Sequence, residues 1–354
     1  MQKSMNQFIK IFTLFVIITT LSTVSIFAQD DKNSTDSNIR MVKIKSHALE
    51  GNLIGDPSIR EMAVLLPPTY FISSTMKFPT VYYLHGLSNR KAGHLANFDM
   101  LIKFYKLMKE KKLKEMVIVA VDGTTVFGGS YFTDSPTIGN FEEYICKEIV
   151  TLIDSMFRTI PYRNSRAIAG FSMGGYGAIK LGMKYSQTFS RLASLSGSPL
   201  SMRYRKSIYK NALANHTPPR TIGELSDTIT FEKNWSLAAA YAKAAAFSPN
   251  PAKPPLFLDL PFQFSASDDR DPVWQKWLDD DPLSLVAHYQ SNLRKLDQIY
   301  IDHGDDETTL GTEDFIRELV RYGIGFTHYV FRGDHVDELY LRHVRMLQFL
   351  SIHW

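Results

Sequence analysis

A serine flanked by glycines, in the stretch Gly170-Phe171-Ser172-Met173-Gly174-Gly175, is the part of the sequence that most directly predicts chemistry. The apolar run Arg166–Ala169 predicts a short buried strand before it, and Tyr176–Met183 predicts a helix after it. A Gly-x-Ser-x-Gly turn between a strand and a helix is the nucleophile-elbow pattern. The alternative is a glycine-rich turn with an incidental serine. In the strand–turn–helix context we predict that Ser172 is a nucleophile.

A serine hydroxyl is a weak nucleophile until a base takes its proton. His335 is the predicted base because it follows the predicted strand Thr327–Phe331 and a glycine. His303 is the rival candidate, since it follows the predicted strand Gln298–Asp302. The acidic loop that begins there, with Asp305, Asp306 and Glu307, would supply the carboxylate that orients the imidazole.

These candidates need a scaffold that brings distant loops together. Further strands are predicted at Met41–Leu49, Glu61–Leu66, Pro79–Leu87, Met116–Val121 and Arg191–Leu195, and further helices at Asn97–Lys111, Phe141–Phe157 and Pro282–Leu296. Strands that alternate with helices predict an α/β fold, with a mainly parallel sheet and helices on both faces. Because sites in such sheets lie at the carboxyl ends of the strands, the elbow and the polar loops are expected to open at one end.

The segment Leu200–Pro261 interrupts the alternation of strands and helices. It contains two proline-rich turns and an alanine-rich predicted helix, Trp235–Phe247. We expect a helical insertion over the active-site end of the sheet, where loops that shape substrate specificity usually lie. The alternative is an excursion with only a structural role.

The first 28 residues predict a secretory signal peptide, with Lys3 and Lys10 ahead of an apolar run and Ala28 as the last residue before cleavage. An uncleaved membrane anchor is the alternative. Residues 29–40 are expected to be a disordered leader, and residues 41–354 a single domain. These features predict a secreted or periplasmic protein without stable membrane association after cleavage. The formal net charge of +4 is small and its basic residues are scattered, which argues against a nucleic-acid partner.

The sequence predicts no cofactor and no metal site. Neither an HExxH motif nor a paired CxxC motif is present. The acidic clusters Asp268–Asp271 and Asp279–Asp281 lack the spacing of a calcium loop, so we expect solvated loops or helix N-caps there. Cys146 is the only cysteine, cannot form an internal disulfide, and is expected to be buried and inert.

Several segments together resemble one known family: Tyr83-Leu84-His85-Gly86-Leu87, Gly170 to Ala178, Leu195-Ser196-Gly197, the Asp302 to Glu307 loop, and Gly333-Asp334-His335. The chain resembles the esterase D type family of α/β-hydrolases. This family includes S-formylglutathione hydrolases, feruloyl and other carbohydrate esterases, siderophore esterases and mycolyltransferases. The resemblance implies the α/β-hydrolase fold and a Ser–acid–His order along the chain.

The resemblance also implies individual roles. Backbone N–H groups of Leu87 and Met173 would form the oxyanion hole, and His85 would help to shape the first of these loops. Many relatives carry Gly-x-x-Asp in the acidic loop, and here Glu307 stands at that place. Mycolyltransferases use glutamate in this role, so Glu307 is the predicted acid, with Asp306 as the alternative.

The predicted function is therefore a secreted serine esterase that cleaves carboxylic esters through an acyl-enzyme. Acetyl or feruloyl esters linked to carbohydrate are the candidate substrates, because export argues against the cytosolic S-formylglutathione. Two alternatives remain: an acyltransferase of the mycolyl type, and a catalytically silent binding protein that keeps the fold.

Overall fold

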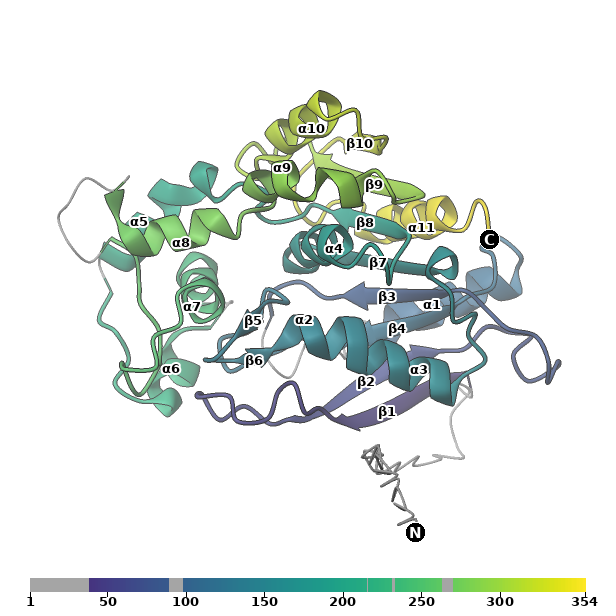
Figure 1. The fold of residues 1–354 in the computed structure, drawn as a ribbon, viewed down its shortest axis with the longest axis horizontal. Coiled ribbons are helices and arrows are strands. Elements are labelled where there is room, and N and C mark those ends of the chain that lie inside the picture. The colour runs from purple at the N-terminus through teal and green to yellow at the C-terminus, as the bar shows by residue number, and fades with distance from the viewer. Residues whose placement is uncertain (1–37, 89–97, 215, 231–232, 263–269) are drawn as a thin grey trace, which may run out of the picture.

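Eight strands form one sheet at the centre of the computed structural model, which describes residues 38–88, 98–214, 216–230, 233–262 and 270–354 (Figure 1). In spatial order they are β1 (Ile39–Lys45), β2 (Ile59–Leu65), β4 (Val117–Val121), β3 (Thr80–Leu84), β7 (Arg166–Phe171), β8 (Arg191–Leu195), β9 (Gln298–Gly304) and β10 (Thr327–Phe331). The pairs β1–β2 and β2–β4 are antiparallel, and all pairs from β4 to β10 are parallel. This confirms the predicted mainly parallel sheet.

The register of the parallel strands brings their carboxyl ends to one level. Leu84 at the end of β3 pairs with Gly170 in β7, Phe171 pairs with Leu195 in β8, and Leu195 pairs with Asp302 in β9. The loops that follow these four strands therefore begin side by side. A separate two-stranded sheet, β5 (Asp134–Ser135) with β6 (Gly139–Asn140), follows β4.

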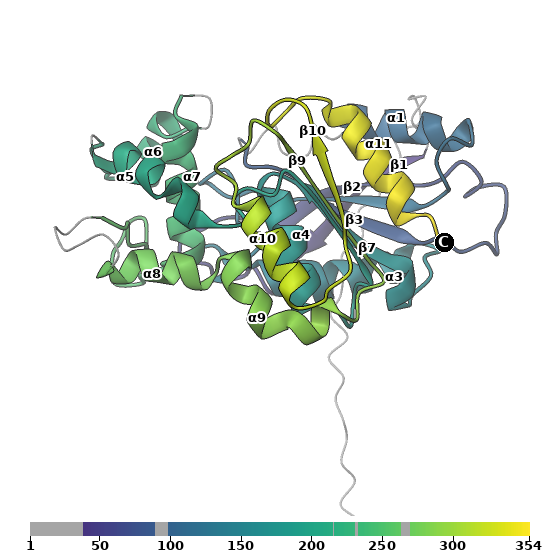
Figure 2. The same ribbon diagram turned by 90° about the horizontal axis from the view of Figure 1, so that it is seen from above.

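Helices cover both faces of the sheet (Figure 2). On one face lie α1 (Phe98–Lys109) and α11 (Leu339–Leu350). On the other lie α4 (Met173–Lys184), α9 (Pro282–Leu293), α10 (Thr312–Arg321) and one long helix made of α2 (Phe141–Glu143), a π-helical segment (Tyr144–Ile149) and α3 (Val150–Met156). Along β3 successive residues alternate between the two cores, with Val81 and Tyr83 in one and Tyr82 and Leu84 in the other.

The segment from Leu200 to Pro261 contains a 3₁₀ turn (Met202–Arg205) and the helices α5 (Lys206–Ala214), α6 (Ile222–Thr228) and α7 (Trp235–Phe247). With α8 (Pro272–Asp279), these helices group at one side of the molecule, beyond an end of the sheet (Figure 1). Helix α7 has the predicted bounds, and every residue from Leu237 to Phe247 is buried. Because the residues on all sides of this stretch are buried, neighbouring elements pack around the whole helix.

Two other expectations from the sequence are met, one lies outside the described residues, and the end of the predicted disordered leader at residue 40 is corrected, because Ile39 and Arg40 pair with β2. Asp271 and Asp281 accept hydrogen bonds at the N-termini of α8 and α9, and Cys146 is buried. The predicted signal peptide is outside the described residues. Strand β1 begins at Ile39, two residues inside the predicted leader. In the part of the chain that the structure describes, no helix is long and apolar enough to cross a membrane.

The stability of the fold is expected to fall as the pH drops below about 6.5, because of His343 in α11. Its Nδ1 lies 2.6 Å from the Leu339 carbonyl and its Nε2 lies 2.6 Å from the Tyr83 hydroxyl, which is the hydrogen-bonding pattern of a neutral ring. Complete burial lowers the pKa of His343 to about 4. The unfolded chain therefore accepts a proton on His343 at a higher pH than the folded protein does. The contribution of neutral His343 to stability is fully present above the unfolded pKa, and it is lost as the pH falls toward the folded pKa.

Between pH 6.5 and 4 the free energy of unfolding is expected to fall by about 3 kcal/mol. Urea unfolding curves at several pH values are the measurement. His343→Gln should lower stability at neutral pH but reduce the pH slope. Substitution of the exposed His353 by Gln is the control and should leave the slope as in the wild type. An equal slope in His343→Gln and wild type would assign the pH dependence to other groups.

Candidate active site

Ser172 lies at the turn between β7 and α4 in strained backbone, with φ +56° and ψ −118°. Its N–H donates to the Leu195 carbonyl at 2.9 Å, which ties the turn to the neighbouring strand β8. The glycines on either side are required by close backbone contacts. A Cβ on Gly170 would lie 2.4 Å from the carbonyl of Gly174, and a Cβ on Gly174 would lie 1.9 Å from the Leu84 oxygen.

Substitution of Gly174 by alanine is expected to destabilise the fold by about 3 kcal/mol or more, because the added methyl group meets backbone atoms of β3 that cannot move aside. The thermal midpoint of the purified variant, or its loss from the soluble fraction, is the measurement. Gly325→Ala is the matched control, since no atom lies within 4 Å of the added Cβ. A midpoint within 2 °C of wild type in Gly174→Ala would contradict the geometry of the elbow.

The structure brings the three predicted catalytic side chains together from three loops. His335 Nε2 lies 2.8 Å from Ser172 Oγ, and His335 Nδ1 lies 2.5 Å from Glu307 Oε1. Since the carboxylate accepts, the Nδ1–H donates to Glu307 and Nε2 is left to accept from the serine hydroxyl. The Phe171 ring packs against the imidazole with its centroid 4.9 Å away. This is the hydrogen-bond order of a Ser–His–acid triad.

Glu307 is the better placed of the predicted acids. Its second oxygen, Oε2, accepts from the Gly304 N–H at 2.7 Å and from Ser196 Oγ at 2.6 Å. Burial alone would raise the pKa of Glu307, but the hydrogen bonds from His335, Gly304 and Ser196 outweigh it and lower the pKa below its usual range. The group is thereby held as a carboxylate.

The other acidic residues near this loop make different contacts. Asp306 is exposed, and its backbone N–H donates to the Gly333 carbonyl at 3.2 Å. Asp305 accepts from the Gly333 N–H at 2.8 Å, which holds the acid loop against the histidine loop. Asp302 is buried and pairs with Arg342. The structure thus places Glu307, rather than the alternative Asp306, beside the imidazole.

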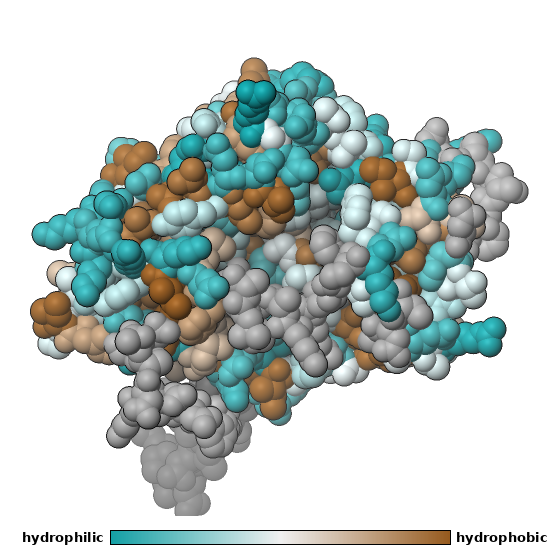
Figure 3. Space-filling view, turned by 180° about the vertical axis from the view of Figure 1, so that it is seen from behind, coloured by the Kyte–Doolittle hydropathy of each residue, from teal (hydrophilic) through white to brown (hydrophobic). Residues whose placement is uncertain are grey.

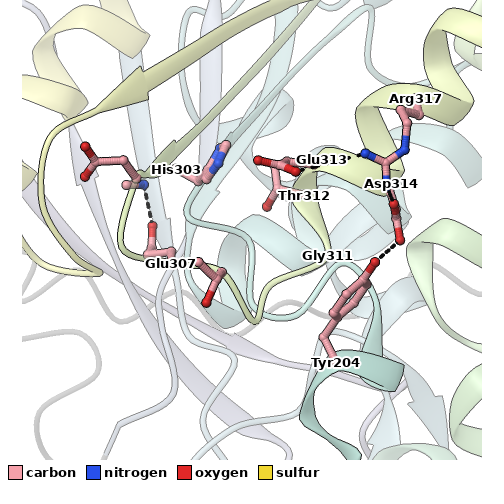
Figure 4. A pocket seen from close by; sticks show the side chains of 11 residues that line it. Tyr204, His303, Glu307, Gly311, Thr312, Glu313, Asp314 and Arg317 are labelled. Carbon is pink, nitrogen blue, oxygen red and sulfur yellow. Dashed lines mark hydrogen bonds and ion pairs between the residues drawn. The ribbon is translucent and has the colours of Figure 1, made fainter.

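His303, the rival base, contacts His328, whereas the imidazole that contacts Ser172 is that of His335. Its ring stacks on that of His328, with centroids 5.0 Å apart, and Nδ1 lies 3.0 Å from His328 Nε2. Both imidazoles have lowered pKa values, chiefly because of burial. His303 and Glu307 line a small pocket of about 120 Å³ between the acid loop and the start of α10 (Figure 4). Thr312, Glu313, Asp314 and Arg317 line its α10 side.

The predicted oxyanion donors flank the nucleophile. Met173 is the first residue of α4, where backbone N–H groups lack acceptors within the helix. Leu87 follows Gly86, and a Cβ on Gly86 would lie 3.3 Å from the Ser172 Cβ. His85 holds this loop: its Nδ1 lies 2.7 Å from the Gly86 carbonyl, and its Nε2 accepts from the Gly123 N–H at 3.0 Å. Both ring nitrogens are thus engaged with backbone, which fits a shaping role.

The surface beside His335 is partly apolar. Val336, just before α11, and Tyr340 and Leu341, in the first turn of α11, are exposed. Figure 3 shows the face of the molecule that carries α1 and α11, where apolar residues lie among polar ones. Among the described residues, no group of three His, Cys, Asp or Glu side chains is arranged to hold a metal ion.

The sheet order, the strained serine turn at the end of β7 and the helices on both faces define an α/β-hydrolase fold. A solved ferulic acid esterase has the same fold, with a TM-score of 0.60 at 19% identity over 88% of this chain and 97% of that one. The predicted fold class is therefore confirmed.

Residues 57–321 match the family model described as "Putative esterase". The chain belongs to this esterase family, and the resemblance inferred from the motifs is confirmed. Esterase Rv1288 of Mycobacterium tuberculosis is 30% identical over 49% of this chain and 35% of its own length. The acetyl esterase of Caldicellulosiruptor saccharolyticus is 26% identical over 44% of this chain and 56% of its own. The chain thus spans about a third of the length of the first of these curated relatives.

Proposed function

We propose that this protein is a serine esterase that cleaves carboxylic esters through an acyl-enzyme, with Ser172, His335 and Glu307 as its triad. The single observation that carries the proposal is the unbroken chain of hydrogen bonds from Ser172 Oγ through His335 to Glu307, at 2.8 and 2.5 Å. The membership in an esterase family supports the same reaction class.

In the first half of the reaction His335 Nε2 takes the hydroxyl proton while Ser172 Oγ attacks the ester carbonyl. The oxygen that becomes negative accepts hydrogen bonds from the N–H groups of Leu87 and Met173. A single donor of this kind contributes about 3–4 kcal/mol to transition-state stabilisation. The imidazolium then gives its proton to the departing alcohol, which leaves an acyl group on Ser172.

In the second half a water molecule repeats the attack. His335 accepts the water proton, the new bond forms at the acyl carbonyl, and the proton returns to Ser172 Oγ as the carboxylic acid leaves. Glu307 stays ionised throughout and stabilises the imidazolium, which agrees with the direction of its pKa shift.

Acetyl or feruloyl groups carried by carbohydrate are the proposed substrates, with export to the periplasm or the medium. The support is the likeness to proteins named acetyl esterase and ferulic acid esterase, together with the signal-peptide pattern at the N-terminus. The apolar residues beside His335 offer a surface for an acyl or aryl group.

The test is a panel of p-nitrophenyl esters of increasing chain length, with methyl ferulate and acetylated xylan, assayed beside labelling by a fluorophosphonate probe. Labelling at Ser172 with turnover of at least one ester is the expected result. A folded protein that shows neither labelling nor turnover would be assigned as a silent binding protein. Addition of an alcohol or sugar as acceptor separates hydrolysis from acyl transfer, because a transferase would form the new ester in preference to the free acid.

A further inference from the structure

A buried arginine gathers the loops that hold the proposed triad. Arg342, on α11, is fully buried, and all five of its N–H donors have acceptors. Two bonds reach the carboxylate of Asp302, with Nε at 3.2 Å and Nη2 at 2.8 Å. Nη1 donates to the backbone carbonyl of His335 at 3.1 Å and to that of Asp337 at 3.3 Å. The fifth donor reaches Ser196 Oγ at 2.5 Å.

Ser196 connects this arginine to the acid. It follows β8 and is completely buried, and its backbone has a positive φ of +43°. Two bonds to Asp302 hold it there, from the Ser196 N–H to the carbonyl at 3.0 Å and to Oδ1 at 3.1 Å. Because Arg342 can only donate, the Ser196 hydroxyl accepts from it, and its own hydrogen is directed to Glu307 Oε2 at 2.6 Å.

We propose that Ser196 and Arg342 are positioning residues of the triad: Arg342 orients the Ser196 hydroxyl, and that hydroxyl fixes the Glu307 carboxylate for the His335 Nδ1–H. This inference rests on the proposed function and extends it. Glutamate has one more rotatable bond than aspartate, so one oxygen must be held elsewhere if the other is to stay on the imidazole. The Gly304 N–H and the Ser196 hydroxyl hold that oxygen.

The same arginine also acts on the histidine side of the pair. Through the His335 carbonyl it fixes the backbone from which the imidazole extends, so one rigid planar group sets both ends of the His335–Glu307 bond. The ring of Phe331, with its centroid 3.9 Å from the guanidinium carbon, packs over its face. The titratable side chains that interact with Glu307 include His335, His303 and Asp302.

The test compares Ser196→Ala with Ser194→Ala. Both serines are buried in or just after β8, and each change removes one hydroxyl, but Ser194 Oγ has no hydrogen-bond partner among the described residues. In Ser196→Ala we expect kcat on p-nitrophenyl acetate to fall about 10- to 100-fold with KM within twofold, because a hydrogen bond to a charged group is lost. Ser194→Ala should keep the wild-type kcat.

The second readout is the downfield proton resonance of the His335 Nδ1–H in the one-dimensional NMR spectrum at a pH where the imidazole is protonated. It should shift or broaden in Ser196→Ala and stay unchanged in Ser194→Ala. The proposal is overturned if Ser196→Ala keeps the wild-type resonance and a kcat within twofold of wild type. Equal losses in the two variants would also overturn it, since a general disturbance of β8 would then be the cause.

Arg342→Lys provides an independent variant, because lysine keeps the charge beside Asp302 but cannot make five directed bonds. A fall in kcat and a shifted resonance are expected in the folded variant. If both kcat and the resonance stay as in the wild type, Arg342 contributes only to stability. The resonance reports the His335–Glu307 bond even if Ser172 is not labelled by a fluorophosphonate. Failure of the proposed function therefore appears as absent labelling in the wild type, and failure of this inference as an unmoved resonance.

Discussion

Ser172→Ala is expected to lower kcat for a soluble ester at least about 10³-fold while leaving the thermal midpoint within 2 °C of wild type. The change removes the oxygen that His335 Nε2 contacts at 2.8 Å and leaves the rest of the hydrogen-bond network in place. The strained backbone at this position, with φ +56°, is tolerated by alanine no worse than by serine. Hydrolysis of p-nitrophenyl acetate and thermal unfolding of the same sample are the measurements.

The control for this variant is the fluorophosphonate probe. Wild-type protein should be labelled once, and Ser172→Ala not at all, whereas variants that only perturb folding would lose labelling and the unfolding transition together. Activity within tenfold of wild type in a folded Ser172→Ala variant would place the nucleophile elsewhere in the chain.

Glu307→Gln is expected to lower kcat by roughly 10² to 10⁴, because an amide can present its N–H to the imidazole and favour the wrong tautomer. Asp306→Asn should change kcat less than about tenfold, since that side chain is exposed and lies on the same loop without contacting His335. The two substitutions are matched in chemistry and differ by one position, so steady-state kinetics on one soluble ester compares them directly. A larger loss in Asp306→Asn would transfer the acid role to Asp306.

Most of the sheet could be predicted because its strands are short apolar runs that end at glycine, proline or polar clusters. The predicted strand Arg191–Leu195 has the observed bounds, and so do Thr327–Phe331 and helix Trp235–Phe247.

Local sequence did not predict α11 or α8. Helix α11 begins four residues after His335 and buries an apolar stripe that includes Met346 and Leu350. The π-helical segment inside the helix predicted at Phe141–Phe157 could not be predicted from the spacing of apolar residues, because the apolar stripe continues through it.

The side chains at the centre of the site were more predictable than those that support them. Gly170, Ser172 and Gly174 have a recognisable spacing, and the two polar loops follow predicted strands. The choice between Glu307 and Asp306 depends on how tightly the loop turns, which needed the three-dimensional structure. Arg342 gave no sequence signal, since an arginine on an amphipathic helix usually lies in solvent. Its burial becomes visible only once Asp302 and Ser196 are placed beside it.

The burial of α7 has a consequence for how specificity in this protein could be redesigned. Because Leu237 to Phe247 contribute to the same core as the sheet, the segment around them cannot be exchanged as a module between homologous enzymes, as a detachable lid could. Deleting it would open a cavity lined by side chains of the central domain. Chimeras that keep α7 and vary only α5 and α6, which carry exposed residues, preserve the buried core and leave room for new sequence. Laboratory evolution restricted to those two helices would therefore sample altered surfaces without repeated losses of soluble protein.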